Sequence, residues 1–417
     1  MTNNKSVLLP LITIGSVFFI LGFITWLNGM LIPYLKISCE LSNFQALLVT
    51  FSFYISYTIM ALPSSIILEK IGFRNGISLG LWIMAIGAFI FIPAAYTRSY
   101  IYFLAGLFVL GTGMALLQTA VNPYVTVLGP IESAAKRISI MGIANKIAGA
   151  MAPLVLALFI IRDGDKELIH SIPEMNIQAK TLFLDSLALR VVNPYIGMAI
   201  VLSLTGFLIR LLHLPKIKDL DTDSEENLEE NSKTSIWQYP NLWLGVIALF
   251  FYVGVEVIAG DTVIQYAQEK GLLLSDAKVF TSYTMLAMLI GYIFGIIVIP
   301  KFISQHKALA YSAILGLIFS FLAIFSNGIW SVYFIALLGL SNALVWPAIW
   351  PLAIKGLGQF INKGSALLIM AISGGAILPL LWGRLSDLFS PQEAYWILPP
   401  AYLIIYLYSV KGYKITK

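Results

Sequence analysis

Three polar side chains lie at four-residue intervals inside a long apolar segment, LLQTAVNPYVTVLGP, which ends at Pro130. Because residues four apart share one face of an α-helix, Gln118, Asn122 and Thr126 form a polar stripe. Water is absent from the hydrocarbon of a membrane, so such a stripe must face other protein or a wet cavity. The stripe therefore predicts either a binding face or a face that joins neighbouring helices by hydrogen bonds.

Membrane-spanning helices are needed to carry this stripe, and the composition indicates them. The chain has 417 residues, of which 59% are hydrophobic and 11% are charged, with a mean hydropathy of +0.86. Apolar runs of about twenty residues recur along it, and each is long enough to cross the hydrocarbon core. We predict an all-α integral membrane protein with twelve transmembrane helices, at roughly 8–33, 43–68, 76–95, 100–127, 138–161, 191–213, 240–266, 276–300, 306–326, 329–354, 364–387 and 392–410.

Basic residues are distributed unevenly over the connections between these helices. With the N-terminus inside, the short inner segments hold twelve lysines and arginines, from Lys5 to Lys417, and the short outer segments hold five. The positive-inside rule therefore favours two cytoplasmic termini. The net charge of +5 has the same explanation, so no nucleic-acid partner is expected.

Several kinds of chemistry are excluded by what the sequence lacks. Cys39 is the single cysteine, so no internal disulfide can form. The histidines His170, His213 and His306 fall in predicted loops or at helix ends, and no spacing typical of metal ligands, catalytic nucleophiles or a phosphate-binding loop occurs. We therefore expect no enzyme, no metal and no cofactor. Any active transport must then be driven by a gradient across the membrane rather than by ATP.

The chain divides into two related halves. An acidic segment of low apolar content, DLDTDSEENLEENSK, predicts a flexible cytoplasmic linker at 214–239 between six-helix bundles at 1–213 and 240–417. A constant offset of 232 relates Gly22 to Gly254 and Gly29 to Asp261, with three further aromatic pairs nearby. Two parallel repeats are typical of transporters that bind substrate near the midplane and expose it alternately to each side.

Two connections carry further signals. Residues 162–190 are expected to form an outer loop. The inner loop after the second helix reads LPSSIILEKIGFRNG, in which Glu69, Lys70, Gly72 and Arg74 form an acidic-basic-x-glycine-x-basic pattern. This pattern resembles the signature loop of the major facilitator superfamily, which implies a gating loop that latches the halves in the outward-open state. An ordinary positive-inside loop is the alternative.

The polar stripe resembles the fourth-helix motif of the fucose permease and glucose/galactose transporter family of bacterial sugar symporters. LSNFQALLV at 41–49, YVGVEVIAGD at 252–261 and SALLIMAISGGAILPLLWGRLSD at 365–387 resemble other helices of this family. The resemblance implies a major facilitator fold in a bacterial inner membrane and a secondary sugar importer driven by H⁺ or Na⁺. It also implies that an acid in the first helix and another in the fourth serve coupling and binding.

Both of those acids are replaced in this sequence. The first-helix position falls on Gly29, and the fourth-helix position falls on Gln118. Glutamine there resembles the glucose/galactose branch, which favours a neutral hexose such as glucose or galactose. We hypothesise that Asp261, the counterpart of Gly29 in the repeat, supplies the missing acid. Lys146 in the fifth helix would be its partner until a proton or Na⁺ competes for the carboxylate.

Glu256 is the competing candidate for ion coupling. It precedes Asp261 by five residues, about 140° round an α-helix, so one narrow face cannot hold both. A charge at mid-membrane costs roughly 2.5–3.5 kcal/mol on insertion scales, so Lys146, Glu256 and Asp261 must each be paired, neutralised or functional. A static tether between Lys146 and one acid is the alternative to a coupling role.

A sugar needs donors and acceptors for its hydroxyl groups and aromatic rings against its C–H face. The tenth helix offers one amide and two indoles at four-residue intervals, Asn342, Trp346 and Trp350. An interfacial aromatic belt is the alternative for the two tryptophans. The predicted substrate-binding residues are Gln118, Asn122, Asn145, Trp346, Asn342, Trp350, Trp26 and Asn28.

Together these observations favour a cation-coupled importer of a neutral hexose, working as a monomer in the lipid bilayer by alternating access. The sequence leaves open a fucose or N-acetylhexosamine symporter, and an uncoupled facilitator or exporter of small neutral solutes. A membrane sugar sensor that does not transport is a remoter alternative, because sensors usually carry a signalling domain or a long structured tail.

Overall fold

Helices account for the regular secondary structure in the part of the chain that the computed structural model describes. That part comprises residues 4–127, 134–162, 164–211, 235–299, 302–357 and 360–415, and no strand occurs in these ranges. Eleven helical spans in them are long and apolar enough to cross a membrane. The 13-residue α19 (Leu398–Val410) occupies the predicted twelfth position. The all-α membrane fold is therefore confirmed.

The first half supplies six of the predicted spans: α1 (Asn4–Trp26) with α2 (Asn28–Ser38), α3 (Asn43–Ile71), α4 (Phe73–Thr97), α5 (Tyr100–Val127), α6 (Ala134–Ile160) and α9 (Val192–Leu211). Local capping explains two of these boundaries. α3 begins with a capping box, in which Ser42 and Gln45 exchange hydrogen bonds between side chain and backbone. It ends at Gly72, whose φ of +76° suits a glycine, and α4 follows directly.

The second half supplies the other spans: α10 (Pro240–Asp261) with α11 (Val263–Glu269), α13 (Phe280–Val298) after the short α12 (Leu274–Ala277), α14 (Gln305–Phe325), α15 (Ile329–Asn342) with α16 (Val345–Ile354), α17 (Ile361–Met370) with α18 (Gly374–Leu388), and α19. Several predicted spans are therefore interrupted, among them the first, seventh, tenth and eleventh. Irregular backbone at membrane depth is tolerated only where other groups satisfy it. Near the seventh-span break, Thr281 Oγ1 donates to the carbonyl oxygen of Gly260 at 2.7 Å.

The prediction of an outer loop at 162–190 is wrong, because most of this segment is helical. It forms α7 (Asp165–Ser171), a 3₁₀ turn and α8 (Ile177–Leu189). Tertiary contacts hold it: Asp165 is buried in an ion pair with Arg190, and the Tyr34 hydroxyl donates to the carbonyl oxygen of Leu187. Such short helices carry no long apolar run, so the hydropathy pattern did not reveal them.

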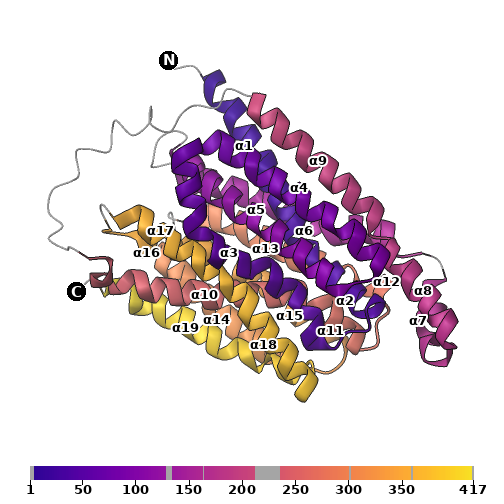
Figure 1. Cartoon of the computed structure of the whole chain (residues 1–417). Coiled ribbons are helices and arrows are strands. Elements are labelled where there is room, and N and C mark those ends of the chain that lie inside the picture. Colours follow the sequence, from indigo (N-terminus) through magenta and orange to yellow (C-terminus); the bar gives the residue numbers. More distant parts are fainter. Residues whose placement is uncertain are drawn as a thin grey trace.

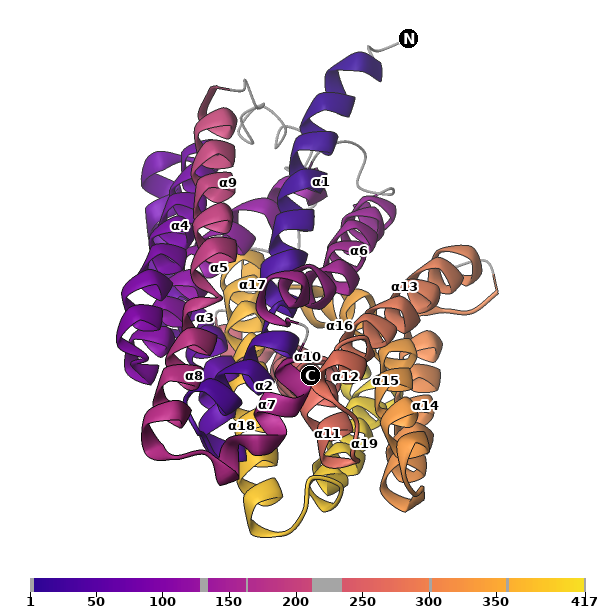
Figure 2. The ribbon, with the colours of Figure 1, turned by 90° about the vertical axis from the view of Figure 1, so that its right-hand side faces the viewer.

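The most extensive contacts between the two halves are made by two pairs of helices. α3 packs against α18, and α6 packs against α13. Figure 1 shows the first half in indigo to magenta and the second half in orange to yellow, and Figure 2 shows α6 beside α13 from another side. Of the predicted linker, 214–234 lies outside the described residues. Its end forms the turn Ile236–Gln238, where Trp237 stacks on Trp243 with 4.4 Å between ring centroids.

Candidate functional site

A buried ion pair joins the two halves inside the apolar spans. Lys146 on α6 lies 2.8 Å from Glu256 on α10, measured from Nζ to Oε1. Both residues are buried, so water screens the pair little. The prediction that Lys146 pairs with Asp261 is therefore wrong. Five residues advance an α-helix by about 7.5 Å, so Asp261 lies more than a turn beyond Glu256, and Lys146 stands at the level of Glu256.

Trp26 holds the lysine of this pair in position. The centroid of its ring lies 4.4 Å from Nζ of Lys146, which is a cation–π contact. The ring also fills two notches formed by glycines, since a Cβ added at Gly149 or Gly260 would lie 2.4 or 2.2 Å from a ring carbon. Trp26 is therefore packed between α6 and α10, and only 2% of its surface is exposed. This placement fits a role in packing these helices together rather than a sugar contact.

Asp261 is an acid without a cationic partner among the described residues. It is fully buried at the end of α10, and its Oδ2 accepts a 3.0 Å hydrogen bond from Thr50 Oγ1 on α3. Its Oδ1 has no hydrogen-bond partner in the same part of the chain. An ionised carboxylate buried in this way is strongly unfavourable. Because Thr50 belongs to the other half, the single hydrogen bond depends on how the two halves are packed.

Four predicted binding side chains are half-buried, so part of the surface of each is not covered by protein: Gln118, Asn145, Trp346 and Trp350. Nε2 of Gln118 donates to the Tyr57 hydroxyl at 3.0 Å, and Nδ2 of Asn145 donates to the carbonyl oxygen of Phe18 at 3.4 Å. Each amide therefore has a fixed orientation and a carbonyl oxygen left as an acceptor. Trp346 stacks on Trp350 with 5.4 Å between centroids. α16, which carries both indoles, contacts α6, which carries Asn145 (Figure 2).

Asn342 is separated from these two tryptophans by a break in the helix and is more deeply buried than they are. The predicted stripe assumed a continuous tenth helix, but the chain turns at Ala343 and Leu344 between α15 and α16. Asn342 is fully buried inside the second half, where its Oδ1 accepts a 2.8 Å hydrogen bond from the Tyr402 hydroxyl. The prediction of one common face assumed an unbroken helix, and it stays a prediction for Asn342, whose amide is enclosed by protein whereas both tryptophans are half-buried.

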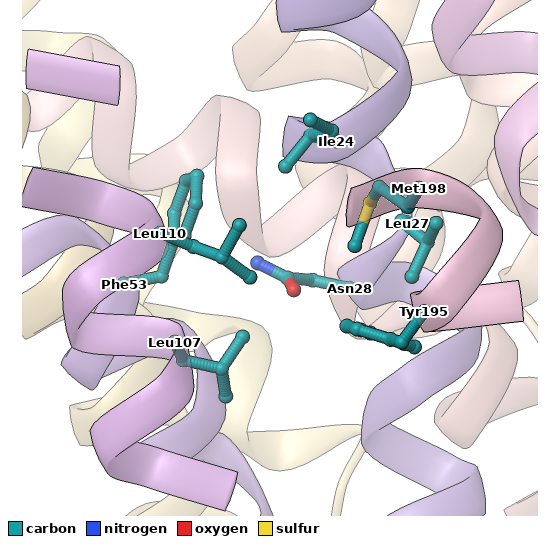
Figure 3. Close-up of a pocket in the computed structure, with 8 residues that line it drawn as sticks. All are labelled: Ile24, Leu27, Asn28, Phe53, Leu107, Leu110, Tyr195 and Met198. Atoms are coloured by element: carbon teal, nitrogen blue, oxygen red, sulfur yellow. The ribbon is translucent and has the colours of Figure 1, made fainter. Parts of the chain in front are cut away.

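Asn28 faces the interior of the first half, away from Trp26. Asn28 follows Trp26 by two positions, which is about 200° round a helix, so the two side chains leave the chain on opposite sides. Figure 3 shows Asn28 directed into a cavity lined by Ile24, Leu27, Phe53, Leu107, Leu110, Tyr195 and Met198. The volume open there to a water-sized sphere is about 10 Å³, which is far too small for a hexose. Asn28 is thus separated from the other predicted binding residues.

Two predicted features fall partly on undescribed side chains. The side chain of Asn122 lies outside the described residues, so the middle of the polar stripe is not placed. In the predicted gating loop the side chain of Glu69 also lies outside them, whereas Lys70 is exposed, Arg74 is half-buried and Gly72 has positive φ. The latch therefore stays a prediction.

Three side chains of the site were missed by sequence reasoning. Tyr252 lies beside Trp346, with 6.5 Å between ring centroids. It precedes Glu256 by four residues, so helical periodicity could have identified it. Tyr57 and Thr50 gave no such signal, because only the packing of α3 against other helices brings them to the site.

Polar contacts close one end of the interface between the halves, which we call the outer end because the charge pattern predicts that it faces out of the cell. Lys36 Nζ lies 3.2 Å from Glu269 Oε1 and 2.7 Å from Asn43 Oδ1. Gln265 also donates to Asn43. The two carboxylate oxygens of Asp387 accept hydrogen bonds from the backbone N–H groups of Asn43 and Phe44, at 2.9 and 2.8 Å. Asp387 on α18 therefore caps the N-terminus of α3 in the other half.

Comparison with known proteins decides the family. The family model described as Major Facilitator Superfamily matches residues 14–378. This chain belongs to the major facilitator superfamily. It is accordingly a multi-pass membrane transporter of a non-enzymatic family, as the sequence predicted.

Relatives of this major facilitator protein cover nearly its whole length. A glucose/galactose transporter of Brucella abortus is 32% identical over 416 residues, covering 99% of this chain and 96% of the relative. An L-fucose-proton symporter of Escherichia coli is 30% identical over 388 residues, covering 92% and 88%. The crystal structure of the Escherichia coli fucose:proton symporter has a TM-score of 0.73 at 28% identity, covering 97% of this chain and 98% of that one.

The outer contacts of this transporter lead to a first prediction. Asp387→Ala removes both hydrogen bonds of this exposed N-cap, and the loss of an N-cap costs about 0.5–2 kcal/mol. We expect it to shift the protein toward conformations with an open outer end. Spin labels on Leu41→Cys and Gln268→Cys, in a Cys39→Ser background, report this separation because both residues line the outer hollow between α2 and α11. Electron–electron double resonance should show a new population of molecules with a longer distance between the two spin labels.

A matched control removes an exposed charge from the same helix end. Arg384→Ala, three residues before Asp387 on α18, should leave the distance distribution as it is in the parent. An unchanged distribution in Asp387→Ala would show that the cap does not hold the outer end closed.

Proposed function

We propose that this transporter imports a neutral hexose, such as glucose or galactose, across a bacterial inner membrane together with H⁺ or Na⁺. The units 1–213 and 240–417 would rock about the sugar and expose it to each side in turn, in a protein that works as a monomer. The named activities of the Brucella abortus and Escherichia coli relatives support sugar symport. The basic residues on the predicted inner segments support an orientation with both termini in the cytoplasm.

The observation that carries cation coupling is the burial of Asp261 beneath the closed outer end. Opening that end would separate α3 from the second half, remove the hydrogen bond from Thr50 and hydrate the carboxyl group. Closing it again would bury a charge unless the carboxylate first bound a proton or Na⁺. Outer closure is thereby linked to cation binding, which is what coupled import requires.

The half-buried amides and indoles support a sugar as the substrate. The carbonyl oxygens of Gln118 and Asn145 can accept hydrogen bonds from sugar hydroxyls. The stacked indoles of Trp346 and Trp350 offer an apolar surface for the C–H face of the ring. Lys146, the residue after Asn145, is paired with Glu256, so these two charges neutralise each other. A neutral hexose therefore fits better than a charged sugar.

Uptake into proteoliposomes tests the proposal. Radiolabelled glucose and galactose should accumulate above the outside concentration when an inward H⁺ or Na⁺ gradient is imposed, and only equilibrate without one. Competition by unlabelled fucose and N-acetylglucosamine ranks the alternative substrates. Absence of uptake of every labelled hexose under both gradients would exclude the proposed function.

One observation favours a second candidate, an uncoupled facilitator. Gly29 stands where the family resemblance implies a first-helix acid, and a Cβ added there would lie 2.5 Å from Thr281 Oγ1, so the structure has no room for an acid. Coupling then depends on Asp261. Equal sugar concentrations on both sides under every imposed gradient, with rapid exchange, would identify a facilitator.

A further inference from the structure

The two carboxyl groups of α10 have different surroundings. Glu256 has the ammonium group of Lys146 at 2.8 Å, and Asp261 has the hydroxyl of Thr50 at 3.0 Å. No ion pair to Asp261 occurs in the ranges that the structure describes. Coupled import needs a carboxyl group that binds a cation and later releases it. The partner of each carboxyl group therefore decides whether that group can bind a transported cation, and so how many cations each transport cycle carries.

Lys146 is held in place by contacts from two other helices. The Trp26 ring covers its ammonium group, and Trp26 itself belongs to an apolar cluster with Met285, Met288 and Tyr292. One turn further along α6, the carbonyl oxygen of Ala150 accepts a 2.5 Å hydrogen bond from Ser282 Oγ on α13. The lysine is thus desolvated and directed toward Glu256.

The helix that carries Glu256 is bound to the same part of α13. Thr281, the residue before Ser282, donates through Oγ1 to the carbonyl oxygen of Gly260 on α10, at 2.7 Å. Neighbouring hydroxyls of α13 therefore bind α10 and α6, one bond on each side. This arrangement fixes the spacing of the two helices one turn beyond the ion pair, whereas the outer contacts depend on exposed side chains.

Other ionisable groups near Glu256 cannot replace the lysine. In the part of the chain that the structure describes, those that interact with it electrostatically are Tyr252 and Asp261 on the same helix, Tyr54 on α3, Tyr292 on α13 and Tyr402 on α19. None of these is a cation. Removing one partner from a buried pair leaves an uncompensated charge, so a free ion binding to Glu256 would first have to displace Lys146.

We propose that Lys146 is a built-in counter-ion that keeps Glu256 out of the coupling cycle, so that a single cation, carried at Asp261, accompanies each sugar. This inference rests on the proposed function and adds a stoichiometry and a role for Lys146. Lys146 is a positioning residue in this scheme, because it acts through Glu256 and touches no transported species. Deleting its charge should create a second cation site at Glu256.

The test measures the number of charges moved per sugar. Proteoliposomes containing the full chain are given potassium diffusion potentials, and the accumulation ratio of the transported hexose is recorded at each potential. One charge per sugar gives about 50-fold accumulation per 100 mV, and two charges give about 2,500-fold. We expect the one-charge slope for the parent and for Lys146→Arg. We expect a steeper slope, approaching two charges, for Lys146→Met.

The double variant Lys146→Met/Glu256→Gln keeps the test decisive if the single variant does not fold. It replaces the ion pair by neutral groups of similar volume, and it should transport with the one-charge slope of the parent. Loss of accumulation in the folded double variant would place coupling at Glu256 and overturn the inference, as would two charges in the parent or an unchanged slope in folded Lys146→Met. Absence of any hexose uptake by the parent would instead remove the proposed function.

Discussion

Asp261→Asn is expected to abolish sugar accumulation while sugar exchange continues. Asparagine preserves the shape of the side chain and can still accept the hydrogen bond from Thr50. It cannot bind and release a proton or Na⁺, so closure of the outer end no longer depends on the cation. The accumulation ratio in proteoliposomes under an imposed gradient should fall from tens-fold to about one. Counterflow of labelled against unlabelled hexose should remain within a few-fold of the parent.

A matched control makes the same chemical change outside the site. Asp276 is an exposed acid on α12 of the same half, so Asp276→Asn should accumulate sugar as the parent does. Thr50→Val tests the cross-half hydrogen bond itself and should slow uptake without removing accumulation. Full concentrative uptake by Asp261→Asn would rule out this residue as the coupling acid.

Trp346→Ala should have the second largest effect, a rise in KM of roughly 10- to 100-fold for the transported hexose. The half-buried indole stacks on Trp350 and lies beside Tyr252, so its removal takes away an aromatic surface and disturbs two further rings. Full burial of a large apolar side chain is worth about 1.5–3 kcal/mol, which corresponds to this range of affinity. Initial rates of labelled hexose uptake over a range of concentrations measure the change.

Another tryptophan of the same half provides the comparison. Trp330 is 66% exposed at the start of α15, so Trp330→Ala should leave KM within about two-fold of the parent. Trp346→Phe, which keeps an aromatic face, should lie between the parent and Trp346→Ala. An unchanged KM in folded Trp346→Ala would place the sugar away from α16.

The sequence alone determined the class of molecule, the spans and the family. Apolar runs of bilayer length fold as helices because hydrocarbon offers the backbone no other hydrogen-bond partners, and this requirement acts locally along the chain. The stripe around Gln118, the acids of α10 and the lysine of α6 were identified in the same way, because a polar group in such a run needs an explanation. The short helices at 162–190 were not identified, because tertiary contacts hold them rather than an apolar run.

Only the tertiary structure decided which of these polar groups meet. The order of Glu256 and Asp261 is visible in the sequence, but the height of Lys146 on the facing helix is not, so the wrong acid was paired with it. A two-residue break separates Asn342 from Trp346, and helical phase turned Asn28 into the first half. The cap of α3 by Asp387 joins residues 343 and 344 positions apart. Contacts of this kind depend on how helices from distant parts of the chain pack, and local periodicity carries no information about that packing.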